Sequence, residues 1–159
     1  MSVIDEVVAA NEHYAQSFKL GDLPMPPARR LAMLGIKTGE AHIIRNAGGI
    51  VTEDALRSLI ISHELLGTEE FMIINHTDCG MLTFKDEALA DRLQQSTGAY
   101  PVVPATFHAF QDVGENVRRQ ILRLRTHPWV AKDIAVRGFV YDVTTGRLRE
   151  VAAEKARTA

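Results

Sequence analysis

Short apolar runs alternate with amphipathic segments along this 159-residue chain, and this pattern constrains its fold more than any other feature. Residues 71–74 are uninterruptedly apolar, residues 134–140 alternate as a strand does, and residues 41–44 form a further short apolar run. We expect each of them to be a strand, the first and the last of them buried. Alternation of strands with helices favours an α/β fold with a mainly parallel central sheet flanked by helices.

Apolar residues recur at helical spacing in several segments, and capping residues mark some of their ends. Ser2 followed by Asp5 resembles a capping box, Thr52 is a candidate N-cap, and Gly67 ends the segment that follows Thr52. Gly146 marks a hairpin turn near the end of the chain. The predicted helices cover residues 3–18, 53–66, 85–95 and 113–124.

Length and composition indicate one domain that spans residues 1–159. The net charge of −2 predicts no general attraction to nucleic acid or to an anionic membrane. No apolar run reaches the roughly 18 residues of a membrane helix, and the first residues lack the basic start of a signal peptide. A single cysteine excludes an internal disulfide. We therefore expect a cytoplasmic protein.

The best functional clue is the pair His76 and Cys79, which follows the apolar run at residues 71–74. In parallel sheets, ligands bind beyond the carboxyl ends of the strands, where this pair lies. Imidazole and thiolate both suit zinc, but zinc usually takes three or four protein ligands. Spacing alone therefore favours an inert buried thiol beside a hydrogen-bonded turn histidine. A nucleophile and base pair, with Asp78 orienting it, is a further alternative.

Two other groups of residues could belong to a site. Gly48 and Gly49 precede a predicted helix and could cradle an anion, although a tight turn is the simpler interpretation. His42 and His63 could in principle bind a metal. For His63, on the apolar face of a helix, a hydrogen-bonded core histidine is the better interpretation.

Several stretches together resemble a β-class carbonic anhydrase of the small bacterial type. The resemblance runs in order over nearly the whole chain, and its most specific parts are Arg-Asn-Ala-Gly from Arg45 and His-Thr-Asp-Cys-Gly from His76. The stretches that carry it are residues 21–24, 26–29, 39–49, 52–58, 66–82 and 137–142.

This resemblance implies a zinc enzyme that hydrates carbon dioxide to bicarbonate. His76 and Cys79 would be metal ligands beside a cysteine from a Cys-x-Asp-x-Arg motif, with water or the motif's aspartate in the fourth position. Zinc would lower the pKa of bound water to about 7, and the hydroxide would attack carbon dioxide. Gly48, Gly49 and Gly80 would line the substrate or anion pocket. The family resemblance also implies a homodimer or higher homo-oligomer in which the first helix packs on a partner.

The chain departs from the family pattern where the Cys-x-Asp-x-Arg motif belongs. Residues 29–35 contain no cysteine and no aspartate. A block of roughly a dozen residues, enough for a whole strand, is missing between Ala32 and Met33. Its loss would remove a zinc ligand, the Asp–Arg pair and part of a core strand, so we expect the sheet to be shortened.

Three interpretations of the missing block remain open. The protein could contain the block although the printed sequence lacks it, and would then be an ordinary zinc enzyme. The deletion could be genuine, which would leave a zinc-deficient, inactive homologue that acts as a binding or oligomerisation module. Cys79 could also serve different chemistry on the same scaffold. For a chain that lacks the block, as this sequence does, we expect weak or no activity and poor zinc retention.

Overall fold

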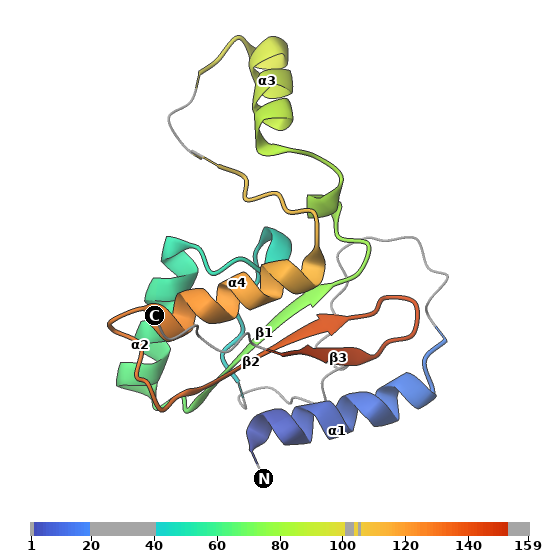
Figure 1. Cartoon of the computed structure of the whole chain (residues 1–159), viewed down its shortest axis with the longest axis vertical. Coiled ribbons are helices and arrows are strands. Elements are labelled where there is room, and N and C mark those ends of the chain that lie inside the picture. Colours follow the sequence, from blue (N-terminus) through green and yellow to red (C-terminus); the bar gives the residue numbers. More distant parts are fainter. Residues whose placement is uncertain (1, 20–40, 101–103, 105, 153–159) are drawn as a thin grey trace.

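In the part of the chain that the structure describes, a three-stranded sheet with helices on both of its faces forms the centre (Figure 1). This computed structural model describes residues 2–19, 41–100, 104 and 106–152. Strand β1 (Glu70–His76) runs parallel to β2 (Ala135–Tyr141), which pairs antiparallel with β3 (Leu148–Val151). The predicted α/β fold with a mainly parallel sheet is confirmed, as are the two strands around residues 71–74 and 134–140.

Helix α4 (Val113–Thr126) covers one face of the sheet and forms the main core with it. Val117, Ile121 and Leu124 from α4 are at most 2% exposed. Gly138 on β2 permits this close packing, because a Cβ atom there would lie 2.4 Å from Val117 Cγ1 and 2.6 Å from Ile121 Cδ1. The glycine therefore sets how closely α4 approaches the parallel strand pair.

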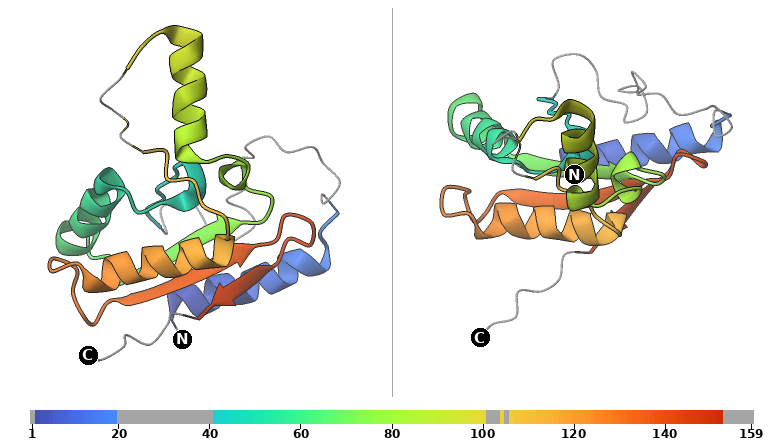
Figure 2. Two further views of the ribbon diagram at one scale, coloured as in Figure 1. Left: turned by 45° about the horizontal axis from the view of Figure 1, so that its top comes forward. Right: turned by 90° about the horizontal axis from the view of Figure 1, so that it is seen from above.

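Helix α1 (Val3–Gln16) packs on the opposite face of the sheet, beside β1 and β3 (Figure 2). Its predicted capping box is confirmed, since Ser2 and Asp5 bond each other's backbone N–H groups. Asn11 clamps the hairpin, donating to Gly146 O at 2.9 Å and accepting from Leu148 N at 2.6 Å. The helical spacing of apolar residues that starts at Val3 predicts an inward-facing Val3, and this is wrong: Val3 is 60% exposed, and the buried residues begin at Ile4.

Arg137 joins α1 to the hairpin on this same face. Its guanidinium donates to Asp5 and forms two hydrogen bonds to Glu150. The hydrogen bond from Arg137 lowers the pKa of both carboxyl groups below its usual range. Half-exposed ion pairs of this kind add little stability, so burial of the core carries most of it.

Helix α2 (Glu53–Leu66) begins and ends where capping residues predict. The Thr52 hydroxyl accepts from Ala55 N, and Gly67 adopts a left-handed conformation with φ 73°. Leu56, Leu59 and other apolar residues of α2 pack against the core. Leu66 does not, since it is 62% exposed.

The prediction of a buried strand at residues 41–44 was wrong. These residues form no strand, and Ile43 and Ile44 are 45% and 44% exposed. A strand needs a neighbour for its backbone hydrogen bonds. In the described part of the chain β1 pairs only with β2, so no strand beside residues 41–44 supplies those bonds. Residues 29–35, where the family motif belongs, lie outside the described residues.

Helix α3 (Asp86–Thr97) projects from the body of the molecule and has no buried residue (Figures 1 and 2). Asp86 ties its base to the returning chain, accepting from the Thr106 hydroxyl and from the N–H groups of Phe107, His108 and Ala109. The Thr106 hydrogen bond, with those three N–H groups, lowers the pKa of Asp86. Among the described residues no helix combines the length and the apolar character needed to cross a membrane.

Replacing Gly138 with alanine should destabilise the protein by about 1–3 kcal/mol, because the added methyl group overpacks the α4 interface. The measurement is urea unfolding followed by circular dichroism. Gly114→Ala on α4 is the matched control, since its Cβ would meet only ordinary contacts and alanine favours helix. Equal destabilisation by the two changes would contradict this account of Gly138.

Replacing Asp86 with asparagine should loosen the base of the α3 arm. A carboxylate with a lowered pKa stabilises the fold above its unfolded pKa and loses that contribution as the pH falls through the folded value. The backbone amides of Phe107, His108 and Ala109 should therefore exchange faster in Asp86→Asn at neutral pH. In the wild type the amide shifts of Phe107 and Ala109 should respond to Asp86 only below the pH range in which an ordinary carboxyl group titrates. Unchanged exchange in Asp86→Asn would contradict the role of this carboxylate.

Candidate metal site

The turn that carries the candidate ligands is fixed to the end of the parallel strand pair. His76 is the last residue of β1 and lies opposite Tyr141 in β2. Thr77 N donates to Tyr141 O at 2.9 Å, and the Thr77 hydroxyl accepts from Val143 N at 3.0 Å. Asp78 then adopts a left-handed conformation with φ 52°, which turns the chain toward Cys79.

The ring of His76 is oriented in a way that suits a metal ligand. Its Nδ1 lies 2.7 Å from Thr77 O, and a carbonyl oxygen can only accept, so Nδ1 carries the proton. In the neutral ring the lone pair is then on Nε2. Metal-binding histidines commonly use their second nitrogen in this way, with the first one bonded to a carbonyl.

Cys79 is a free thiol that is 5% exposed. It packs in a small apolar cluster with Ile50, Met81 and Phe110. Met81 belongs to the short 3-10 helix η3 (Gly80–Leu82), whose N-cap is Cys79. His76 is therefore fixed by the end of β1, and Cys79, three residues later, is fixed by the start of η3.

The donors around this pair do not complete a zinc site. Within residues 2–19, 41–100, 104 and 106–152, no three histidine, cysteine, aspartate or glutamate side chains gather as a metal site would require. The full sequence also holds no second cysteine. The two donors fit zinc individually, but zinc sites in proteins need at least three protein ligands.

The other two histidines weighed as ligands have hydrogen-bond partners. His42 Nδ1 lies 2.6 Å from the Ser62 hydroxyl. His63 Nδ1 donates to Thr68 O at 2.7 Å, and its ring meets Phe71 edge-on. His63 is thus hydrogen-bonded, as the sequence favoured, but it is half-buried rather than part of the core.

Gly48 and Gly49 form a tight turn within the 3-10 helix η2 (Ala47–Gly49), with φ 76° and 57°. A Cβ atom on Gly49 would lie 2.4 Å from Asn75 Nδ2, so the turn presses against the end of β1. Gly80 is exposed, with nothing within 4 Å of a Cβ built on it. The role of these three glycines in binding an anion stays a prediction.

Comparison with known proteins places this chain in a family. Residues 28–148 match the family model described as carbonic anhydrase. The chain is 46% identical to beta-carbonic anhydrase 1 of Mycobacterium bovis, over 95% of this chain and 99% of that protein. The chain belongs to the β-class carbonic anhydrase family. A carbonic anhydrase structure from Streptococcus mutans superposes with a TM-score of 0.73 at 36% identity, covering 96% of this chain and 99% of that one.

The alignment to the M. bovis protein also bears on the missing block. The alignment spans 164 positions. It includes 95% of this 159-residue chain, which is fewer residues than the alignment has positions. That carbonic anhydrase therefore has positions without a counterpart in this chain. The missing block between Ala32 and Met33 stays a prediction.

A second group of relatives with a similar fold is named for another substrate. A carbon disulfide hydrolase of Acidithiobacillus thiooxidans is 37% identical over 73% of this chain and 67% of that protein. The structure of an apo carbon disulfide hydrolase superposes with a TM-score of 0.68, at 34% identity, over 79% of this chain and 76% of that one. Membership in the carbonic anhydrase family therefore does not by itself fix the substrate.

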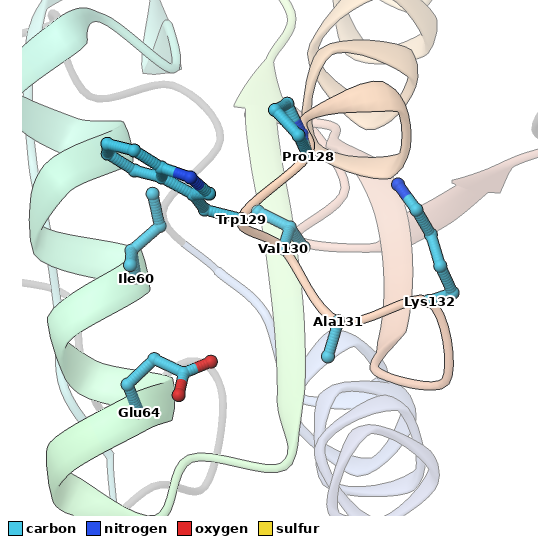
Figure 3. A pocket seen from close by; sticks show the side chains of 7 residues that line it. All are labelled: Ile60, Glu64, Pro128, Trp129, Val130, Ala131 and Lys132. Atoms are coloured by element: carbon cyan, nitrogen blue, oxygen red, sulfur yellow. The ribbon is translucent and has the colours of Figure 1, made fainter.

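A shallow hollow of about 460 Å³ lies between α2 and the loop that precedes β2 (Figure 3). Since this loop leads into the start of β2, the hollow lies at the amino ends of the parallel strands. His76 and Cys79 lie at the carboxyl ends. The hollow is therefore separate from the candidate site, and its lining residues are Ile60, Glu64, Pro128, Trp129, Val130, Ala131 and Lys132.

Sequence reasoning missed three buried amides that surround the glycine turn. Asn75, Asn116 and Gln120 are 3%, 1% and 7% exposed. Asn116 and Gln120 are one helical turn apart and each precedes a core residue of α4, which was the available signal. Polar side chains beside an apolar stripe are buried only when they have hydrogen-bond partners.

The thiol of Cys79 should react slowly with a disulfide reagent in the native protein, because it is almost fully buried. One thiol per chain should become reactive when urea unfolds the protein. Release of thionitrobenzoate from Ellman's reagent measures both rates. A native rate equal to the unfolded rate would show that Cys79 is open to solvent.

Proposed function

We propose that this protein has the zinc-dependent carbon dioxide hydration activity of its family as its ancestral function, and that a chain of this sequence performs it weakly. The single observation that carries the proposal is the half-site formed by the Nε2 lone pair of His76 and the Cys79 thiol at the carboxyl end of β1. Its support is the family match over residues 28–148.

His76 and Cys79 would hold the metal in this proposal. When bound, zinc would supply a nucleophilic hydroxide at neutral pH by acidifying its water. The hydrogen bond from His76 Nδ1 to Thr77 O keeps the ring oriented with Nε2 available. The apolar side chains of Ile50, Met81 and Phe110 keep bulk water from Cys79.

The weak activity that we propose follows from the small number of metal ligands. Two protein donors leave zinc to be held by water or by weak ligands, and each missing ligand lowers affinity. We therefore propose that zinc retention is poor in this chain. The Asp–Arg pair of the family motif, which the sequence also lacks, would not be available to gate the site with pH.

A zinc-deficient homologue that acts as a binding or oligomerisation module is the second candidate. The incomplete donor set of the described residues favours it directly. Nucleophilic chemistry at Cys79 has less support, because Cys79 is buried and Asp78 is exposed at the turn. We also propose a homodimer or higher homo-oligomer and a cytoplasmic location. Tyr14 and Phe18 on and just beyond α1 are half-buried and remain candidates for the interface.

Zinc content and carbon dioxide hydration, measured together, test this proposal. The purified chain should carry well under about one zinc per chain and show weak hydration in a stopped-flow pH-indicator assay. Inserting a Cys-x-Asp-x-Arg strand block between Ala32 and Met33 should bring zinc to about one per chain and raise the hydration rate by orders of magnitude. The matched control is the same block with serine in place of its cysteine.

Each outcome separates the alternatives. Full zinc occupancy and high activity in the unaltered chain would show that its own residues complete the site. A folded insertion variant that binds zinc only when the block contains cysteine supports the half-site. A folded insertion variant with no zinc and no activity would reject His76 and Cys79 as the surviving ligands. Cys79→Ala in the inserted background should abolish zinc binding.

A further inference from the structure

We propose that Asn75, Asn116 and Gln120 are positioning residues that hold the Gly48–Gly49 turn against the apolar cluster around Cys79. Nothing in the family match or in the ligand pattern assigns a role to these amides. The inference rests on the proposed metal site only for its functional consequence, since the positioning itself concerns the thiol.

The three side chains form one directional chain of hydrogen bonds. Val51 N donates to Gln120 Oε1 at 2.9 Å, and Gln120 Nε2 donates to Asn116 Oδ1 at 2.9 Å. Asn116 Nδ2 donates to Asn75 Oδ1 at 2.7 Å. Asn75 Nδ2 then donates to Gly49 O at 3.4 Å.

This chain begins and ends on the same short loop. Val51 N is at one end of it and Gly49 O at the other, and Asn116 Nδ2 also donates to Gly48 O at 3.2 Å. Side chains from β1 and α4 thus bond the loop at Gly48, Gly49 and Val51. Because α4 and β1 both contribute buried residues to the main core, these hydrogen bonds fix the loop to well-packed elements.

The loop in turn packs against the cluster of Cys79. A Cβ atom on Gly48 would lie 3.1 Å from both Met81 Cγ and Phe110 Cε1, which shows how closely the backbone approaches them. Met81 and Phe110 pack with Cys79 and with Ile50, which follows the turn. Movement of the turn away from Met81 and Phe110 should therefore expose the Cys79 thiol to solvent.

The amide groups cannot be replaced by carboxylates at the centre of this chain. Asn116 donates two hydrogen bonds through Nδ2 and accepts one through Oδ1. Of the three amides, it has the most hydrogen bonds within this chain. A carboxylate at this position would face the oxygens of Asn75 and Gly48 with no proton to donate. In a buried hydrogen-bond network of this kind, loss of one donor leaves several neighbouring groups without a hydrogen bond.

The reactivity of the Cys79 thiol tests the proposal, with Asn116→Asp as the variant. Metal-free protein, treated with a chelator, is reacted with Ellman's reagent well below its melting temperature. The native rate should rise by roughly tenfold or more, because local opening beside the thiol becomes more frequent. Gln120→Met, which keeps the volume but removes the donor and the acceptor, should raise the rate in the same direction if Asn116→Asp does not fold.

Asn11→Asp is the matched control. Asn11 is also a buried amide with backbone partners, but it clamps α1 to the hairpin, away from Cys79. At equal loss of melting temperature it should leave the native thiol rate unchanged. An unchanged rate in both Asn116→Asp and Gln120→Met, or an equal rise in Asn11→Asp, would overturn the positioning role.

A second readout separates this inference from the proposed function. Cobalt(II) titration, followed by its thiolate absorption, should show at least about tenfold weaker binding in Gln120→Met if His76 and Cys79 bind metal. Because two donors alone are expected to hold metal poorly, this titration is made on the chain with the Cys-x-Asp-x-Arg block inserted, and absence of cobalt binding there would count against the metal site. The thiol rates would still decide whether the amides position Cys79.

Discussion

The parallel register of β1 and β2 determines where every candidate functional residue lies. It places His76 opposite Tyr141, and the hydrogen bonds of Thr77 to Tyr141 O and Val143 N then fix the turn that leads to Cys79. The register depends on the packing of α4, which reaches both strands because Gly138 has no side chain. The candidate site therefore rests on a well-packed support, although the described residues do not supply a complete set of metal donors.

Rigidity and chemical competence are separate properties in this protein. The family fold is retained well enough to superpose on a relative with a TM-score of 0.73. The donor set depends instead on a few side chains, and the sequence lacks a second cysteine. A fold is stabilised by many small contacts, whereas a zinc site fails when one ligand is lost. Family membership and catalytic strength can therefore diverge in one chain.

Much of the architecture could be predicted from local sequence signals. Ser2, Thr52 and Gly67 marked helix ends correctly because capping depends on nearby backbone groups. The error at residues 41–44 arose because strand formation depends on a distant partner, which an apolar run cannot reveal. His76 and Cys79 were singled out from their spacing and their family motif, and their role as metal ligands stays a prediction. The amides of Asn75, Asn116 and Gln120 were not predicted, since they bond one another across two elements and also bond backbone groups of a third segment.

The outer edge of β1 has a consequence for the handling of this protein. Within the described residues, β1 has a neighbour on one side only, although its residues alternate between buried and half-buried positions as in an interior strand. Natural edge strands are usually shielded by charges, prolines or bulges, yet residues 71–74 are all apolar. An interior strand left at an edge is a template on which other chains can add. An apolar edge of this kind favours association between chains, so it bears on solubility at high concentration independently of catalysis.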